Sequence, residues 1–183
     1  MGHLTDTAGN SNDVSDGYVP APGVYTLAVE ASDNAGNTAS YEPRFFVVYD
    51  PAGGFATGGG WINPDSMSTL PGGKASFGFV AKYRDGKSTG NLEFQYNDAN
   101  INLKSTTIDW LVISGVSAQF QGTGTIGGEG VYTFRVLAKD NGEPGVDVDE
   151  FDIKIWKGTD TGGDPIHKAK NVIAGGNIRV HKK

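Results

Sequence analysis

The chain has 183 residues, 28 of them glycine and none cysteine, and a formal charge of −6. The lack of cysteine excludes disulfides, thiol catalysis and cysteine-ligated zinc, and no apolar run reaches the roughly 18 residues of a membrane-spanning helix. Residues 1–54 hold seven acids and one base, whereas residues 55–183 are neutral. Neither part has the basic surface that binds phosphates, so we expect no nucleic-acid partner.

The glycines separate short runs rich in β-branched and aromatic residues, a pattern typical of strands joined by tight turns. No window shows the apolar periodicity of a helix. The composition therefore predicts an all-β protein.

The first long strand pattern begins at Gly23 and recurs 107 residues later from Gly130, with eight of twelve positions identical. In each copy alternate residues are apolar, which predicts a half-buried strand with Tyr132, Phe134 and Val136 inside in the second copy. Each copy begins Gly-x-Tyr, which is typical of the tyrosine corner of immunoglobulin-like (Ig-like) sandwiches.

Residues 1–50 are expected to be the closing part of an Ig-like domain, because a complete sandwich of this class needs about 100 residues. We predict a hairpin here, with one strand from residue 23 and another over 39–50. Two strands alone are marginally stable in water. We therefore expect the hairpin to pack on the rest of the chain or to pair with another copy of the chain.

Residues 51–183 are expected to form a second unit that starts at the turn Asp50–Gly54. Alternating and aromatic-rich runs predict strands at 55–62, 74–83, 91–97, 101–114, 117–126, 130–140, 149–157 and 171–181. So many short strands in about 130 residues predict an antiparallel β-sandwich.

Several segments within residues 40–183 also carry a family resemblance. They are Phe45–Ile62, Gly73–Val80, Asp109–Ile113 and Gly175–Lys182. In order and spacing, residues 40–183 resemble the post-COAP-type module of bacterial secreted multidomain proteins, preceded by the end of a bacterial Ig-like or PKD-like domain. The resemblance implies an extracellular, usually C-terminal accessory module, with the neighbouring domains of a parent protein as partners. It carries no catalytic residues to transfer.

The acidic segment (residues 140–152) is the best candidate binding site. It holds six carboxylates and one amide around a Gly-Pro turn, and calcium prefers six to eight such oxygens on a flexible loop. The alternative is a solvated turn that keeps charge beside an edge strand. The candidate calcium ligands are Asp140, Asn141, Asp147, Asp149 and Asp152.

Three tryptophans, Trp61, Trp110 and Trp156, are candidate sugar-binding residues, because aromatic faces stack on sugar rings. Each lies inside a strand-like run, so packing is the competing interpretation. An exposed tryptophan beside polar groups would favour a polysaccharide partner, and burial of all three would favour a structural module.

Catalysis has little support in the sequence. None of the three histidines, His3, His167 and His181, lies in a catalytic motif. We therefore predict a non-catalytic, extracellular structural, spacer or binding module of a larger bacterial secreted or surface protein, stiffened by calcium. A carbohydrate-binding module is the alternative, and a small carboxylate-based hydrolase is the third possibility.

Overall fold

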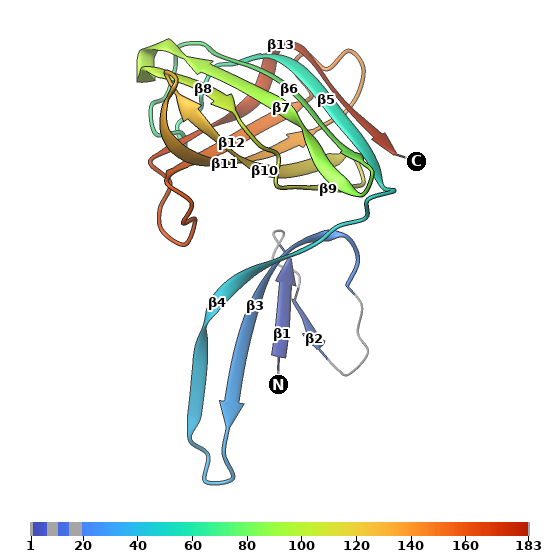
Figure 1. Ribbon diagram of the computed structural model, residues 1–183, viewed down its shortest axis with the longest axis vertical. Coiled ribbons are helices and arrows are strands. Elements are labelled where there is room, and N and C mark those ends of the chain that lie inside the picture. The colour runs from blue at the N-terminus through green and yellow to red at the C-terminus, as the bar shows by residue number, and fades with distance from the viewer. Residues whose placement is uncertain (1, 7–10, 15–19, 183) are drawn as a thin grey trace. The chain divides into compact units, whose positions relative to one another are not determined.

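The computed structural model describes residues 2–6, 11–14 and 20–182. It divides the chain into two compact units, Met1–Asp50 and Pro51–Lys183, at the turn where the sequence places the boundary (Figure 1).

The first unit is a four-stranded antiparallel sheet. Its strands are β1 (Gly2–Asp6), β2 (Ser11–Val14), β3 (Gly23–Ser32) and β4 (Thr38–Val48), in the order β2-β1-β3-β4. The predicted hairpin is β3–β4, and its turn forms because the Asp33 carboxylate accepts the backbone N–H groups of Ala35 and Asn37 at 2.9 Å each. The sequence analysis missed β1 and β2, since their residues show no apolar alternation.

The second unit contains nine strands and one short 3₁₀ turn, η1 (Asn97–Ala99). The strands are β5 (Gly54–Ile62), β6 (Ala75–Arg84), β7 (Lys87–Tyr96), β8 (Ile101–Ser105), β9 (Trp110–Ser114), β10 (Ser117–Ile126), β11 (Glu129–Lys139), β12 (Glu150–Lys157) and β13 (His167–Lys182). The single strand predicted over 101–114 is two strands, because the backbone N–H groups of Thr106 and Thr107 turn to the carbonyl of Thr123 between them.

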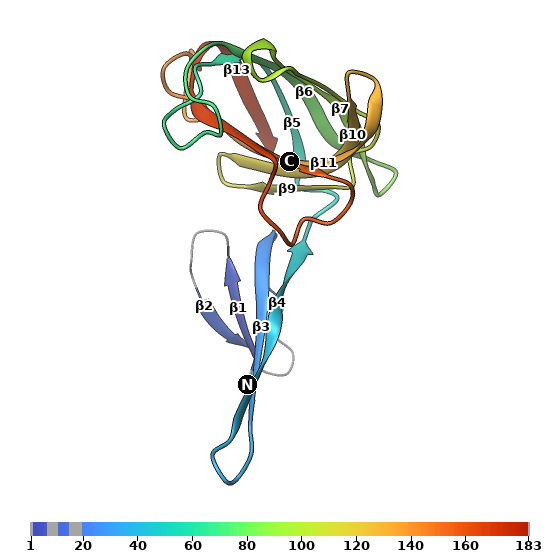
Figure 2. The same cartoon turned by 90° about the vertical axis from the view of Figure 1, so that its left-hand side faces the viewer.

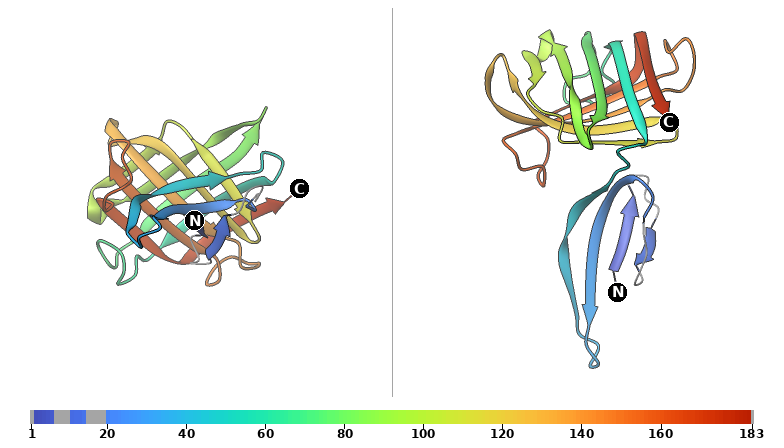
Figure 3. Two further views of the ribbon diagram at one scale, coloured as in Figure 1. Left: turned by 90° about the horizontal axis from the view of Figure 1, so that it is seen from below. Right: turned by 45° about the vertical axis from the view of Figure 1, so that its right-hand side comes forward.

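These strands close into a barrel, where the sequence predicted a sandwich of two sheets. Hydrogen-bonded pairing runs in the order β11-β12-β13-β5-β6-β7-β8-β10 and returns from β10 to β11, with β9 added beside β10 (Figures 1 and 3). Closure depends on β10, which pairs with β9 along its first half and with β8 along its last three residues. A side chain at Gly122 or Gly124 would collide with the carbonyls of Thr107 or Lys104 at this crossing.

The barrel interior is filled by apolar side chains, most of them aromatic or β-branched. Phe151 lies at its centre, with its ring stacked 3.9 Å from that of Phe77. Phe120 contacts Phe79 with a centroid distance of 5.1 Å. The alternation predicted for the repeat is confirmed in β11, where Phe134 and Val136 are fully buried and Arg135 lies on the outer face; Tyr132 is half-buried at the edge of the core.

Replacing Phe134 by alanine should lower the free energy of unfolding by about 3–5 kcal/mol, because the cavity would lie among side chains that cannot collapse onto it. Urea unfolding followed by tryptophan fluorescence measures the change. The control is Val131→Ala on the same strand, where the side chain is exposed and the expected change is within about 0.5 kcal/mol. An equal loss of unfolding free energy in the two variants would contradict the strand register.

His167 is the one histidine that the fold buries among the described residues. Its side chain is 4 % exposed, it packs edge-on against Tyr96, and its Nε2 atom has no hydrogen-bond partner in the described part of the chain. Burial lowers the pKa of His167 because the charged imidazolium would lose its hydration.

The full chain should therefore lose stability as the pH falls through about 6.5, the ordinary histidine pKa. Below that value the unfolded chain takes up a proton that folded His167 refuses, so protonation favours unfolding. Urea unfolding at pH 7.5, 6.5 and 5.5 measures this dependence. His167→Leu should flatten it and His181→Gln, at an exposed position on the same strand, should not. If the stability of His167→Leu depends on pH as that of the wild type does, other groups cause the dependence.

Candidate functional site

The acidic segment lies along the second half of β13. Asp149 is fully buried; its two carboxylate oxygens accept the backbone N–H groups of Asn141 at 2.9 Å and of Ile178 at 2.8 Å. Asp140 accepts the N–H of Val180 at 3.0 Å. These carboxylates therefore take the place of a neighbouring strand, because β12 pairs with β13 only as far as Val172.

The five predicted calcium ligands are brought together only in part. Asp140, Asn141 and Asp149 meet at the edge of β13, but the side chain of Asp147 is exposed and its backbone bonds Ile173. Asp152 lies on the outer face of β12, opposite Lys170. Within the described residues, no group of three or more histidines, aspartates or glutamates is placed to hold a metal ion.

Asp149→Asn should lower the free energy of unfolding by about 1–3 kcal/mol, since the amide that replaces one oxygen cannot accept a hydrogen bond and leaves a buried N–H unsatisfied. Thermal melting with and without the chelator EGTA measures the effect, which should appear in both conditions. Asp147→Asn is the matched control and should melt like the wild type.

The same melts test calcium binding, which stays a prediction. A melting temperature of the wild type that rises with calcium and falls back with EGTA would support it by mass action. An unchanged melting temperature from micromolar to millimolar calcium would remove it.

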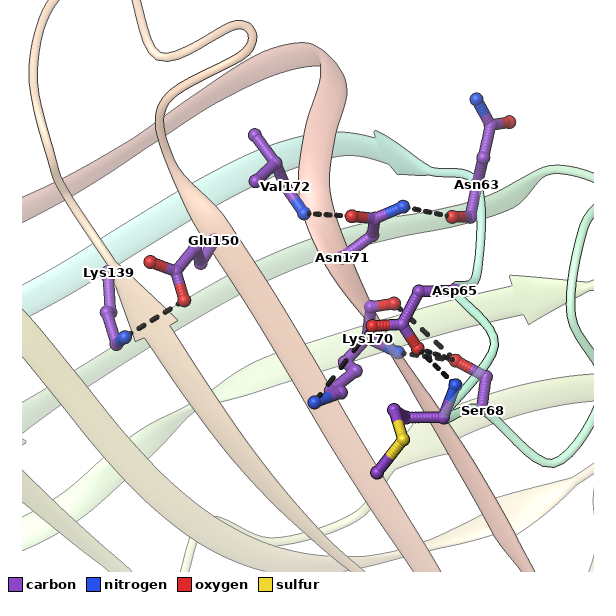
Figure 4. A network of polar contacts seen from close by, with 9 residues as sticks. Asn63, Asp65, Ser68, Lys139, Glu150, Lys170, Asn171 and Val172 are labelled. Carbon is purple, nitrogen blue, oxygen red and sulfur yellow. Dashed lines mark hydrogen bonds and ion pairs between the residues drawn. The ribbon is translucent and has the colours of Figure 1, made fainter. Parts of the chain in front are cut away.

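A second cluster of polar side chains lies on the outer face of β11–β13 (Figure 4). It surrounds a depression of about 370 Å³. Lys139 and Glu150 form an ion pair at its edge, with 2.9 Å between Nζ and Oε2. Across the depression the Asp65 segment (residues 63–72) covers the free edge of β13, where the Asp65 carboxylate lies 4.0 Å from the Lys170 ammonium. The sequence analysis missed these residues, because only strand pairing brings them together.

Two carboxyl groups in this depression have opposite pKa shifts. Burial raises the pKa of Asp152, partly opposed by Lys154 and Lys170. The hydrogen bond from Lys139 lowers the pKa of Glu150. Such a pair resembles the acid and base of a glycosidase. However, both carboxylate oxygens of Glu150 already accept hydrogen bonds, one from Lys139 and one from Asn141. This geometry favours a structural role for Glu150 over proton transfer.

Two of the three tryptophans flank one cation. The Arg135 guanidinium carbon lies 5.8 Å from the ring centroid of Trp110 and 5.4 Å from that of Trp156, and its N–H groups donate to Gln121. Trp156 is buried and donates its indole N–H to the Gly163 carbonyl at 2.7 Å. This cluster is stabilised by cation–π attraction, and it holds Trp156 away from solvent.

Trp61 lies elsewhere on the barrel. Its ring covers Gly175, and Lys74 lies 4.7 Å from the ring centroid. Trp61 pairs with Gly175 of β13, whereas Ile155, next to Trp156, pairs with His167. These β13 positions are eight residues apart, or about 26 Å along a strand. The three tryptophans therefore do not form a common sugar platform, which was the alternative to packing.

In comparisons with known proteins, no family model, no curated protein and no solved structure matches this chain. In the part of the chain that the structure describes, no helix has the length and apolar character needed to cross a membrane.

Proposed function

We propose that the chain is a non-catalytic, extracellular structural module of a larger bacterial secreted protein. This proposal rests on the role that the acidic segment has in the structure. Asp140 and Asp149, the most ligand-like groups in the sequence, are both bonded to the backbone of β13. Their carboxylate oxygens therefore stabilise the barrel.

The ends of the second unit also support an accessory module. The first residue of β5, Gly54, pairs with Lys182 near the end of β13. Both ends of this unit therefore lie at the same edge of the barrel, which suits attachment to a neighbouring domain at that edge. This agrees with what the resemblance to post-COAP-type modules implies.

One contact in the first unit favours an Ig-like ending there. The Tyr25 hydroxyl donates to the carbonyl of Ala21, four residues upstream, at 2.7 Å. Such a bond is typical of the tyrosine corner of Ig-like sandwiches. A preceding Ig-like domain is the kind of neighbour that we propose for this module.

Resistance to proteolysis tests the structural role, because an extracellular scaffold must keep its open states rare. Thermolysin added to the full chain should leave a fragment close to residues 51–183, and Asp149→Asn should shorten the lifetime of that fragment several-fold. Cleavage of the wild-type barrel as fast as that of the urea-unfolded chain would contradict the proposal.

An activity assay tests the absence of catalysis. We expect no release of reducing sugar from neutral or acidic polysaccharides by the full chain. Turnover that Asp152→Asn and Glu150→Gln abolish, while both variants stay folded, would instead assign the hydrolase function to the depression on β11–β13.

A further inference from the structure

A hollow with a volume of about 440 Å³ lies on the outer face of β6 and β7. Its walls are the outward side chains of Ser76 and Gln95 on one side and of Val80 and Asn91 on the other. Glu93 lies between them and is held at 3.4 Å by Lys104 of the next strand. No part of the acidic segment or of the depression on β11–β13 contributes to this hollow.

The floor of the hollow is open at Gly78, and Gly59 of β5 lies beside it as the residue that pairs with Gly78. The fold does not require these glycines. Neither has a positive φ; a Cβ atom at Gly78 would meet nothing within 4 Å, and one at Gly59 would meet only the Phe77 carbonyl, at 3.9 Å. By contrast, a Cβ atom at Gly60 would collide with the backbone of Gly175.

Glycine inside a strand lowers stability, and where packing does not explain it, it often marks a place where a ligand approaches the backbone. The walls fit a hydroxyl-rich ligand. Within the described residues, the side chains of Ser76, Asn91 and Gln95 show no hydrogen bond to other protein groups. Hydroxyl and amide groups can both donate and accept, as the hydroxyls of a sugar do.

Other polymers fit less well. A peptide could not bind at the hollow as a strand added to β6, since β6 is paired with β5 and with β7 along its two edges. An anionic glycan would meet the Glu93 carboxylate, which lines the hollow.

We propose that the hollow over Gly78, with Gly59 beside it, binds a neutral polysaccharide chain. One or two sugar rings lie on the glycine floor, and the amides of Asn91 and Gln95 bond their hydroxyls. Trp61 of β5 pairs with Ser76, which lines one end of the hollow. This binding is additional to the structural role and does not depend on it.

Affinity electrophoresis of the full chain tests the proposal, with mixed-linkage β-glucan, xyloglucan and galactomannan as neutral probes and polygalacturonate as the acidic comparison. At least one neutral probe should retard the wild type, and polygalacturonate should not. Gly78→Val should weaken binding at least tenfold while its melting temperature stays equal or rises, since valine favours strands. Gly163→Ala is the matched control, because this glycine also has open space around it but lies outside the hollow.

Binding to none of the three neutral probes, binding to polygalacturonate alone, or full binding by Gly78→Val would overturn the proposal. If Gly78→Val does not fold, the double variant Asn91→Ala/Gln95→Ala takes its place. It changes only exposed side chains, and the same loss of binding is expected. The thermolysin and melting experiments are unaffected by any of these outcomes, so the structural role stands or fails separately.

Discussion

The last strand, β13, has to hydrogen-bond along both edges although neither neighbouring strand runs along its whole length. Its first part, His167–Val172, pairs with β12, and its second part, from Ile173 onward, pairs with β5 (Figure 2). Near the start of the second part, Gly175 and Gly176 pass so close to β5 that a side chain at either position would collide with it. Each part is therefore left with one unpaired edge, and unpaired backbone groups in a barrel wall are costly.

Two polar segments supply hydrogen-bond partners to these unpaired edges, one segment for each edge. The Asp65 segment covers the first, where the N–H groups of Lys168 and Lys170 donate to the hydroxyls of Thr69 and Ser68. The acidic segment covers the second through Asp140 and Asp149. Polar residues that look like ligands in the sequence are thus part of the wall, and the groups free to meet a partner are found instead on the outer faces of strands with two paired neighbours.

Much of the fold could be predicted locally. The alternation that places Phe134 inside and Arg135 outside is a property of one strand and survives any arrangement of its neighbours. The sandwich prediction failed because closure depends on the break at Thr106–Asp109, which lets β10 pair with both β8 and β9. Of the candidate site, Asp140, Asn141 and Asp149 do gather, but Asp152 and the tryptophans separate because strand pairing distributes them around the barrel.

By itself, the sequence determined that the protein is β-rich, where its two units divide and which residues of most strands face the core, since turn chemistry and alternation act over a few residues. Only the tertiary structure decided which carboxylates complete the wall and which glycines leave a hollow. Gly60 and Gly78 are the same residue in similar strands, yet one is required by a backbone that passes close by and the other lies under open space. That difference arises when the strands meet, because it depends on what lies opposite each position across the sheet.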